Sequence, residues 1–346
     1  MSKRNPARGK NRATKSGEAL LLKRIENAAQ FRRQKTANAA GIRLGIGDDA
    51  ALWRPRRGFE TILTCDWFLE GTHFLRDVHP VDAVGWKCLA RAVSDIAAMG
   101  GEPRCFLLSL ALPESDSGRW LHGFLGGLRR ASRKFRCPLA GGDTTRCKDI
   151  LINLSVVGEV KAGQGVLRSG ARPGDKLFVS GRLGEAELGL RYLRKNKQRP
   201  PSTQEPRLKK HLYLEPRLAL GQWLATRRLA TAMMDLSDGL SSDLTRLCHA
   251  SGAGATIQVE RIPLPGDIFL KNFSNTQRLN AALHGGDDYE LLFTVAQGNA
   301  RKIPRRIFGV ALTEIGEITS GRKINLLNPA GKPVPLHAGG WDPFRK

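Results

Sequence analysis

Six short segments of this 346-residue chain set acidic side chains beside glycine, serine or threonine, and they are the best candidates for a chemical site. Together they hold 12 of the 32 acidic residues. Carboxylates with small neighbours suit Mg²⁺, which takes hard oxygen ligands and leaves room for water and phosphate oxygens. The segments are GIGDDA (45–50), TCDWFLEGTHF (64–74), ARAVSDIAAMGG (91–101), AGGDTTR (140–146), MDLSDGLSSD (234–243) and HGGDDYEL (284–291).

Any single one of these aspartates could instead cap a helix or stabilise a turn, and for one segment alone that use is favoured. Six such segments are harder to explain as caps. Two unit charges 4 Å apart repel by roughly 4 kcal/mol at an effective dielectric of 20. If folding gathers several of these carboxylates, cations must accompany them, and the same cations can bridge to a polyphosphate.

Other machinery for phosphate chemistry is absent from the sequence. There is no GxxxxGK[ST] and no HRD or DFG, which excludes a P-loop and a protein-kinase fold. GIGDDA fits GxGxxA formally, but two aspartates stand where a dinucleotide fold would receive a pyrophosphate on bare amides. The seven histidines are dispersed without HExxH, no nucleophilic triad is legible, and no catalytic acid or base is predicted.

The net charge of +24 has two interpretations. Residues 1–36 carry 11 Lys or Arg against two Glu and predict a basic, disordered tail. Such a tail could bind nucleic acid or anionic lipid weakly, or it could simply be solvated, which is the favoured interpretation. The aromatic content of 6% and the lack of a recognisable module argue against nucleic-acid binding as the main role.

The six cysteines are scattered without a CxxC pair, so neither a zinc site nor a disulfide framework is expected. This pattern predicts a reduced, cytoplasmic protein. No run of 18 apolar residues is present, so no membrane span is expected.

Hydrophobic periodicity predicts two α/β units that follow the tail. We expect an N-terminal domain over 37–161 and a C-terminal domain over 162–346, with the glycine-rich stretch 161–175 as the junction. The first unit is expected to have strands at 60–66, 105–112 and 150–160 and helices at 81–99 and 118–135. The second is expected to have strands at 176–180, 255–259 and 291–295, helices at 184–193, 216–231 and 241–250, a loop at 198–205 and a hairpin at 325–335.

Taken in order, the acidic segments closely resemble the thiamine-monophosphate kinases, of the superfamily that includes aminoimidazole ribonucleotide synthetase and selenophosphate synthetase. Single segments are weak signals, but the ordered set from about residue 41 to 344 is specific. The matching segments are GIGDDA, D-x-x-x-E-G-x-H-F (66–74), SDIAAMGGEP (94–103), AGGDTTR, RSGARPGD (168–175), DLSDGLSSDL (235–244) and GGDDYEL (285–291).

The resemblance implies ATP-dependent phosphorylation of thiamine phosphate to thiamine diphosphate, by direct in-line transfer assisted by several Mg²⁺ ions. It also implies a two-domain α/β fold of the α+β type, like that of aminoimidazole ribonucleotide synthetase. The N-terminal domain would pair in a homodimer, and ATP would bind in the cleft between the domains.

The resemblance also assigns roles to individual residues. Metal ligands fall on Asp48, Thr64, Cys65, Asp66, Asp95, Asp143, Asp235 and Asp238. ATP contacts fall on Gly142, Asp143, Arg168 and Ser237, and substrate contacts on His73, Asp287 and Trp341. Cys65 stands where relatives usually have Thr or Ser, and Asp287 where they often have Glu. Trp341 could offer a cation–π contact to the thiazolium ring or could cover a core edge, and the resemblance favours the ligand.

Two alternatives remain open from the sequence. One is another ATP-using synthetase of the same superfamily; against selenophosphate synthetase, whose N-terminal segment normally carries a reactive Cys or selenocysteine, residues 1–36 contain no Cys. The other, from a different class, is a nucleic-acid-binding protein acting through the basic tail.

Overall fold

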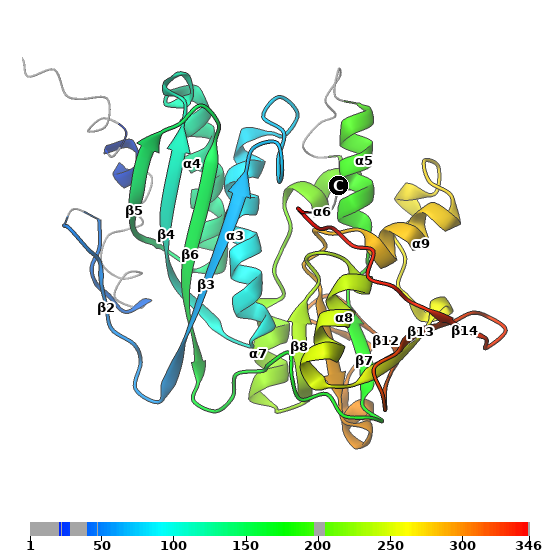
Figure 1. The fold of residues 1–346 in the computed structure, drawn as a ribbon. Coiled ribbons are helices and arrows are strands. Elements are labelled where there is room, and N and C mark those ends of the chain that lie inside the picture. Colours follow the sequence, from blue (N-terminus) through cyan, green and yellow to red (C-terminus); the bar gives the residue numbers. More distant parts are fainter. Residues whose placement is uncertain (1–20, 22, 28–39, 47, 197–204, 345–346) are drawn as a thin grey trace, which may run out of the picture.

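The computed structural model describes residues 21, 23–27, 40–46, 48–196 and 205–344. Nearly all of the predicted basic tail, 1–36, and of the predicted loop, 198–205, lies outside these residues. Two sheets follow one another along the chain, so the predicted two-unit α/β organisation is confirmed (Figure 1). The domain boundary predicted between 161 and 162 stays a prediction.

The first sheet has four strands in the order β3, β6, β4 and β5. Their bounds are β3 Phe59–Leu69, β6 Leu151–Lys161, β4 Glu102–Leu112 and β5 Leu139–Arg146. The helices α3 (Val81–Ala98) and α4 (Arg119–Phe135) cover one face and share its apolar core. The core includes Ile96 of α3 and Phe124 of α4, both fully buried.

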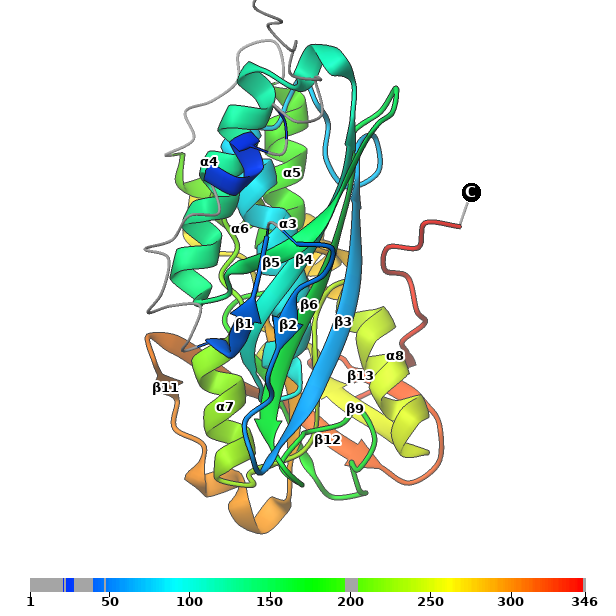
Figure 2. The same cartoon turned by 90° about the vertical axis from the view of Figure 1, so that its left-hand side faces the viewer.

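The opposite face of this sheet is largely open. Alternation along β3 sends Ile62 and Phe68 into the core, whereas Leu63 and Trp67 are 75% and 55% exposed. Two short strands, β1 (Ile42–Leu44) and β2 (Leu52–Trp53), pack on this face (Figure 2). Ile42 of β1 packs against Ala140 of β5, so β1 and β2 cover the β4–β5 side of this face. The β3 side of the open face stays exposed.

The second sheet runs in the order β14, β13, β9, β12, β7, β10 and β8, with β11 paired to β12. The bounds are β7 Lys176–Ser180, β8 Ala230–Asp235, β9 Gly254–Gln258, β10 Leu291–Val295, β11 Arg306–Ile307, β12 Val310–Thr319, β13 Ile324–Leu327 and β14 Pro333–Pro335. One face packs on α8 (Leu240–Ser251) and α9 (Asn275–His284), and the other packs on α7 (Leu218–Thr226). Two further helices, α5 (Glu185–Lys195) and α6 (Lys209–Leu212), pack on each other through Leu193 and Leu212.

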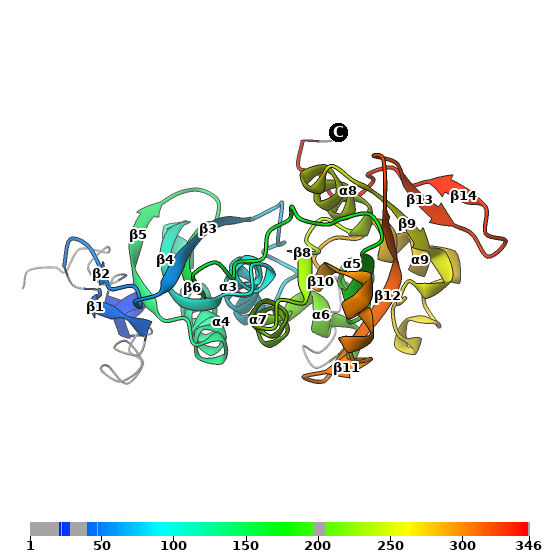
Figure 3. The same ribbon diagram turned by 90° about the horizontal axis from the view of Figure 1, so that it is seen from below.

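The helices α3 and α7 lie between the two sheets (Figures 1 and 3). They approach closely at Gly221, where an added Cβ would stand 2.0 Å from the carbonyl oxygen of Ala97. A larger residue at position 221 would push the helices apart. This crossing brings the C-terminal turn of α3 next to the end of β8, and with it two of the acidic segments.

Most predicted elements are present, but one predicted helix is too long and some strands were not predicted. The helix predicted over 216–231 ends at Thr226, because Arg228 adopts a left-handed conformation (φ 52°) and β8 begins two residues later. The segment AGGDTTR, which no predicted element covers, lies in strand β5. The central strand β12 was not predicted.

All six cysteines are free thiols. Across the residues that the structure describes, no helix has the length and apolar character needed to cross a bilayer.

Candidate active site

Three of the predicted metal carboxylates gather where α3 meets β8. Asp66 lies on β3, Asp95 on α3 and Asp235 at the end of β8. Thr64, two residues before Asp66 and on the same face of β3, donates its hydroxyl hydrogen bond to Asp95 Oδ2. Burial raises the pKa of Asp66 to about 6; Arg91 opposes this effect and Asp95 and Asp238 add to it.

The carboxylate of Asp235 is the most deeply buried of the three. Burial raises its pKa, like that of Asp95, to about 6. The buried atom Asp235 Oδ2 makes no hydrogen bond of normal geometry with a described residue, although the Ser94 hydroxyl lies near enough to lower the pKa of the carboxyl. A buried carboxylate oxygen without a donor is costly, and a hard cation would satisfy it.

This donor set fits a Mg²⁺ ion that the protein holds through few ligands. In the described part of the chain, no three His, Cys, Asp or Glu side chains are placed to hold a single metal ion together. Mg²⁺ is commonly bound through only one or two carboxylates, with waters and substrate phosphates completing its shell. The spacing therefore suits ions shared between the protein and a phosphate ligand.

Asp143 does not join this cluster within one chain. Register pairs Asp66 with Leu154, Leu154 with Leu108, and Leu108 with Gly142. Gly142 thus lies three strands from Asp66, or about 14 Å at the usual strand spacing. Asp143 pairs with Ser109 and points to the open face of the sheet, whereas Asp66 points to the helix-covered face.

Asp48 also lies apart from the cluster. It follows β1 in an exposed loop, where its Oδ1 accepts a hydrogen bond from the amide of Asp49. The neighbouring Gly45 lies over β5, since a Cβ added there would stand 3.6 Å from the carbonyl oxygen of Ala140. Of the six aspartates that the resemblance assigns to metal, Asp48 and Asp143 therefore lie apart in the single chain, whereas the other four lie in or beside the cluster.

The side chain of Cys65 points away from Asp66, onto the open face. Its sulfur lies 3.1 Å from Nδ2 of Asn153 on the neighbouring strand. A thiol is a poor Mg²⁺ ligand, and here it faces away from the buried carboxylates; the carbonyl oxygen of Cys65 is the better candidate donor.

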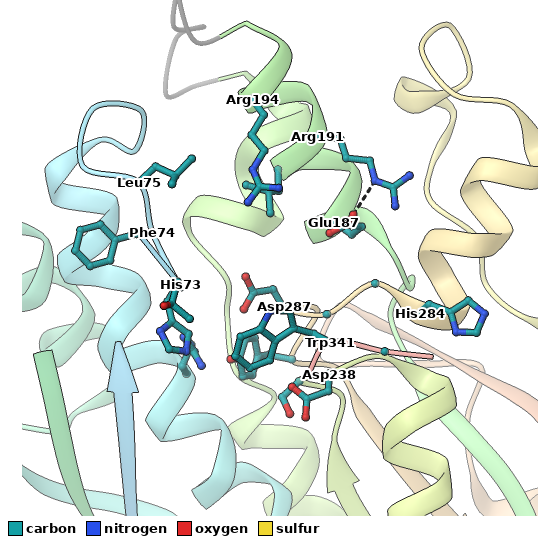
Figure 4. Close-up of a pocket in the computed structure, with 18 of the residues that line it drawn as sticks. His73, Phe74, Leu75, Glu187, Arg191, Arg194, Asp238, His284, Asp287 and Trp341 are labelled. Atoms are coloured by element: carbon teal, nitrogen blue, oxygen red, sulfur yellow. Dashed lines mark hydrogen bonds and ion pairs between the residues drawn. The ribbon is translucent and has the colours of Figure 1, made fainter. Parts of the chain in front are cut away.

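The predicted substrate residues meet in one cavity of about 420 Å³ between the two domains (Figure 4). His73, Asp287 and Trp341 all line it, together with Ser237 and Asp238. These lining residues therefore come from four separate segments: the turn after β3, the loop before α8, the loop before β10 and the C-terminal segment. The carboxylate of Asp238 lies among these lining residues and also influences Asp66, so the cavity borders the carboxylate cluster.

His73 is held in one tautomer. The amide of Leu69 donates to its Nδ1 at 3.0 Å, so a neutral ring carries its proton on Nε2. Burial, with Arg91 and Lys87 nearby, lowers the pKa of His73 to about 4. The ring is therefore neutral near pH 7 and can donate one hydrogen bond without adding positive charge.

Asp287 belongs to a buried charged network. Its Oδ2 accepts a hydrogen bond from Lys87 Nζ at 2.7 Å, and Lys87 Nζ lies 3.3 Å from Nδ1 of His211. Burial alone would raise the pKa of Asp287, but Lys87, Arg91 and His211 hold it well below its ordinary value. The cavity thus contains a permanently ionised carboxylate.

The C-terminal segment is tied to the loop before α8. The amide of Trp341 donates to the carbonyl of Asp238 at 2.9 Å, and the amide of Gly340 donates to Ser242 Oγ at 3.0 Å. The loop itself is held by Asp243, whose Oδ2 accepts from the amides of Asp238 and Gly239. Asp243 is therefore one acidic residue of the six segments that stabilises a turn.

The predicted nucleotide contacts lie in different places. Arg168 is exposed beside the cluster, where its charge lowers the pKa of Asp95 and Asp235 against the effect of burial. Ser237 lines the cavity. Gly142 lies at the far strand β5 with φ 155°, and a Cβ there would stand 1.9 Å from the carbonyl oxygen of Leu108, so only glycine fits.

Sequence reasoning missed two cations on α3. Lys87, Arg91 and Asp95 recur every four residues, which places them on one helix face. The signal was available in the sequence, because a predicted metal ligand at position 95 marks the functional face of that helix.

Known families and proteins match most of this chain. The chain matches the family models of the AIR synthase related protein, N-terminal domain, over residues 47–160 and C-terminal domain over residues 172–327. It is 39% identical to the thiamine-monophosphate kinase of Buchnera aphidicola, over 84% of this chain and 88% of that protein.

Solved structures give the same result. The thiamine-monophosphate kinase of Stenotrophomonas maltophilia superposes with a TM-score of 0.78 at 32% identity, covering 91% of this chain and 96% of that one. A structure described as AaThiL complexed with AMPPCP and TMP superposes with a TM-score of 0.73 at 34% identity, covering 86% and 92%. The chain therefore belongs to the thiamine-monophosphate kinase family, within the AIR synthase related proteins.

Proposed function

We propose that this protein transfers the terminal phosphoryl group of ATP to thiamine phosphate, giving thiamine diphosphate and ADP. The observation that carries the proposal is the cavity in which His73, Asp287 and Trp341 meet beside the buried carboxylates. A cation-binding pocket next to a Mg²⁺-binding edge suits a substrate that carries a thiazolium at one end and a phosphate at the other. Relatives that share most of the chain are thiamine-monophosphate kinases.

The carboxylates of Asp66, Asp95 and Asp235 would hold Mg²⁺, with the hydroxyl of Thr64, the carbonyl of Cys65 and the carboxylate of Asp238 as neighbouring donors. When bound, Mg²⁺ neutralises phosphate charge and orients the polyphosphate. Asp238 is paired with Arg246 at 2.5 Å, and we expect it to exchange this partner for a metal-bound ligand.

The transfer needs no strong base. A phosphate monoester has a second pKa near 6, so an oxygen of thiamine phosphate is already ionised at neutral pH. The protein's task is to hold two anionic groups in line and to neutralise their charge. Arg168 and Ser237, at the edge of the cluster and in the cavity, are placed to hold the ATP phosphates.

The thiamine end is held by the other side of the cavity. The ionised Asp287 offers negative charge to the thiazolium, and the indole of Trp341 offers its face to the same cation. The neutral His73 can donate from Nε2 to a substrate acceptor.

We further propose that the protein acts as a homodimer through the open face of the first sheet. Leu63, Trp67 and Leu107 are 75%, 55% and 41% exposed on that face, an apolar patch that a second copy would bury. In a dimer whose two-fold axis runs along the strands, β5 of one copy lies over β3 of the other. That arrangement would bring Asp48, Gly142 and Asp143 of one copy towards the site of its partner, which explains why they lie apart within one chain.

The test is direct. Purified protein with ATP, MgCl₂ and thiamine phosphate should form thiamine diphosphate and ADP in equal amounts, and chelation of the metal should stop the reaction. No product should form when ATP is offered together with the substrates of aminoimidazole ribonucleotide synthetase or of selenophosphate synthetase. Turnover of either of those substrates, with none of thiamine phosphate, would select the other branch of the superfamily. The predicted cytoplasmic location stays a prediction, and most of the basic tail lies outside the described residues.

A further inference from the structure

We propose that Arg91 binds the phosphate group of thiamine phosphate and so makes the site select the phosphorylated substrate over free thiamine. This inference rests on the proposed function and adds to it the residue that recognises the acceptor anion. Three observations support the inference: the position of Arg91, the contacts of its guanidinium with aromatic rings, and a buried donor that has no partner among the described residues.

Arg91 stands where the cavity meets the carboxylate cluster. It lines the cavity, and it lies one helical turn from Lys87 and one from Asp95 on the same face of α3. Its charge acts on Asp66 and Asp95 on one side and on His73 and Asp287 on the other. A substrate whose thiazolium lies by Asp287 and whose phosphate points to the cluster must pass this residue.

Two aromatic rings fix the guanidinium. Its central carbon lies 5.1 Å from the ring centroid of Phe68 and 5.8 Å from that of Tyr289. Contacts of this kind orient an arginine at little further cost in side-chain entropy. The guanidinium is therefore held in place before any ligand arrives.

One donor of Arg91 is unused. Its Nε is buried and has no hydrogen-bond partner in the described part of the chain. A buried donor without a partner is rare and costly. The nearby carboxylates are proposed to bind Mg²⁺. A phosphate oxygen of the substrate is therefore the acceptor that would satisfy Arg91 Nε.

Other cations of the same cavity are differently engaged. Arg191 Nε is paired with Glu187 Oε1 at 2.6 Å, and Lys87 Nζ is paired with Asp287 Oδ2 at 2.7 Å. The charge of Arg194 acts on the buried His79 and His211. Arg91 is thus the cavity arginine placed on the cluster side.

The chemistry explains selectivity. A guanidinium matches a phosphate dianion with two parallel hydrogen bonds, which a hydroxyl group cannot accept in the same way. Free thiamine would leave the Nε donor of Arg91 without an acceptor, whereas the phosphate of thiamine phosphate would supply one.

The experiment compares two ligands on the full-length protein by calorimetry in MgCl₂ without nucleotide. Wild-type protein should bind thiamine phosphate more tightly than thiamine. In Arg91→Met the affinity for thiamine phosphate should fall by about tenfold or more, the lower range for a lost charge-assisted contact, while the affinity for thiamine stays within about twofold. Arg91→Lys keeps the charge but loses the two parallel donors of the guanidinium, so it should retain part of the preference. This variant replaces Arg91→Met in the test if Arg91→Met does not fold.

Arg191→Met is the matched control, because its guanidinium is already paired with Glu187; it should change the two affinities by the same factor. Equal losses for both ligands in Arg91→Met would show that Arg91 only supports the fold or the carboxylates, and no loss would show that it does not touch the phosphate. Either result would overturn the inference. Failure of the proposed function would look different, since wild-type protein would then make no thiamine diphosphate whatever its binding preference.

Discussion

The rings of His73 and Trp341 face one another at the cavity, with their centroids 5.6 Å apart and their planes inclined by 53° (Figure 4). One comes from the turn after β3 and the other from the last residues of the chain, which are separated by 268 positions (341 − 73). The contact places the C-terminal segment in the wall of the cavity, where it does more than cover a core edge.

Trp341→Ala should therefore raise the KM for thiamine phosphate more than the KM for ATP. A cation–π contact contributes about 0.5–2 kcal/mol, so a rise of about 2- to 30-fold is expected for thiamine phosphate. Steady-state kinetics with each substrate varied in turn measures the effect. Trp341→Phe, which keeps an aromatic face, should recover most of the loss; equal changes in the two KM values would rule out a contact specific to the thiamine end.

Asp66→Asn should lower kcat by at least about 100-fold while leaving a folded protein, because it removes charge from the metal edge and not a core contact. Circular dichroism and thermal unfolding check the fold. Glu60→Gln on the same strand is the control, since Glu60 is exposed and its carboxylate accepts a hydrogen bond from the amide of Gly163 at 3.3 Å. Loss of the folded state in Asp66→Asn, or normal turnover, would contradict the assigned role.

Glu290 should make the free energy of unfolding fall at acidic pH. Its buried carboxylate accepts from Ser180 Oγ at 2.5 Å and pairs with Lys210 and Arg217. Burial alone would raise its pKa, but Lys210 and Arg217 lower it from 4.5 to about 2. The folded state thus binds fewer protons than the unfolded state between pH 4.5 and 2, so this stabilisation is complete above pH 4.5 and is lost as pH falls towards 2.

Glu290→Gln should accordingly lower the free energy of unfolding at pH 7 by about 3 kcal/mol, because it leaves buried cations without a counter-charge. Its stability should also fall less steeply than that of the wild type between pH 4.5 and 2 in urea titrations. Glu317→Gln removes the exposed partner of Lys176 and should cost no more than about 1 kcal/mol. An unchanged acid limb in Glu290→Gln would mean that another group dominates it.

The proposed dimer predicts complementation. Asp66→Asn and Asp143→Asn proteins should each be inactive, but a mixture allowed to exchange subunits should regain about a quarter of wild-type activity, because half of the dimers are mixed and each has one intact site. Trp67→Glu, on the open face, should yield a monomer by light scattering. If the mixture stays inactive although mixed dimers form, Asp66 and Asp143 do not act in a site shared in this way.

Local signals in the sequence predicted much of the fold. Period-four and period-two patterns placed α3, α4 and most strands within a few residues. The helix predicted over 216–231 was wrong because apolar residues of α7 and β8 follow one another without a glycine or proline between them, and only the left-handed Arg228 ends the helix. The strand β5 was missed because a glycine pair and an aspartate indicate a turn unless the neighbouring strand β4 is known.

The acidic segments show a similar division. In GGDDYEL, Asp287 lines the cavity, Asp288 accepts from the amides of Gly184 and Ala186 at the start of α5, and Glu290 forms a buried ion pair. Sequence alone cannot separate these uses, because each depends on which distant cation or helix end lies nearby. The separation of Asp48 and Asp143 from Asp66 could not be predicted either, since it depends on the strand order and on the face to which each side chain points.

If buried carboxylates hold Mg²⁺ so that ATP can phosphorylate a phosphate group, ³¹P NMR of the purified protein with ATP, MgCl₂ and thiamine phosphate should follow the transfer. We expect the thiamine phosphate signal to be replaced by the two signals of a diphosphate ester as ADP accumulates in equal amount, and no change without Mg²⁺. ADP formed together with inorganic phosphate, while thiamine phosphate remains intact, would rule out the transfer.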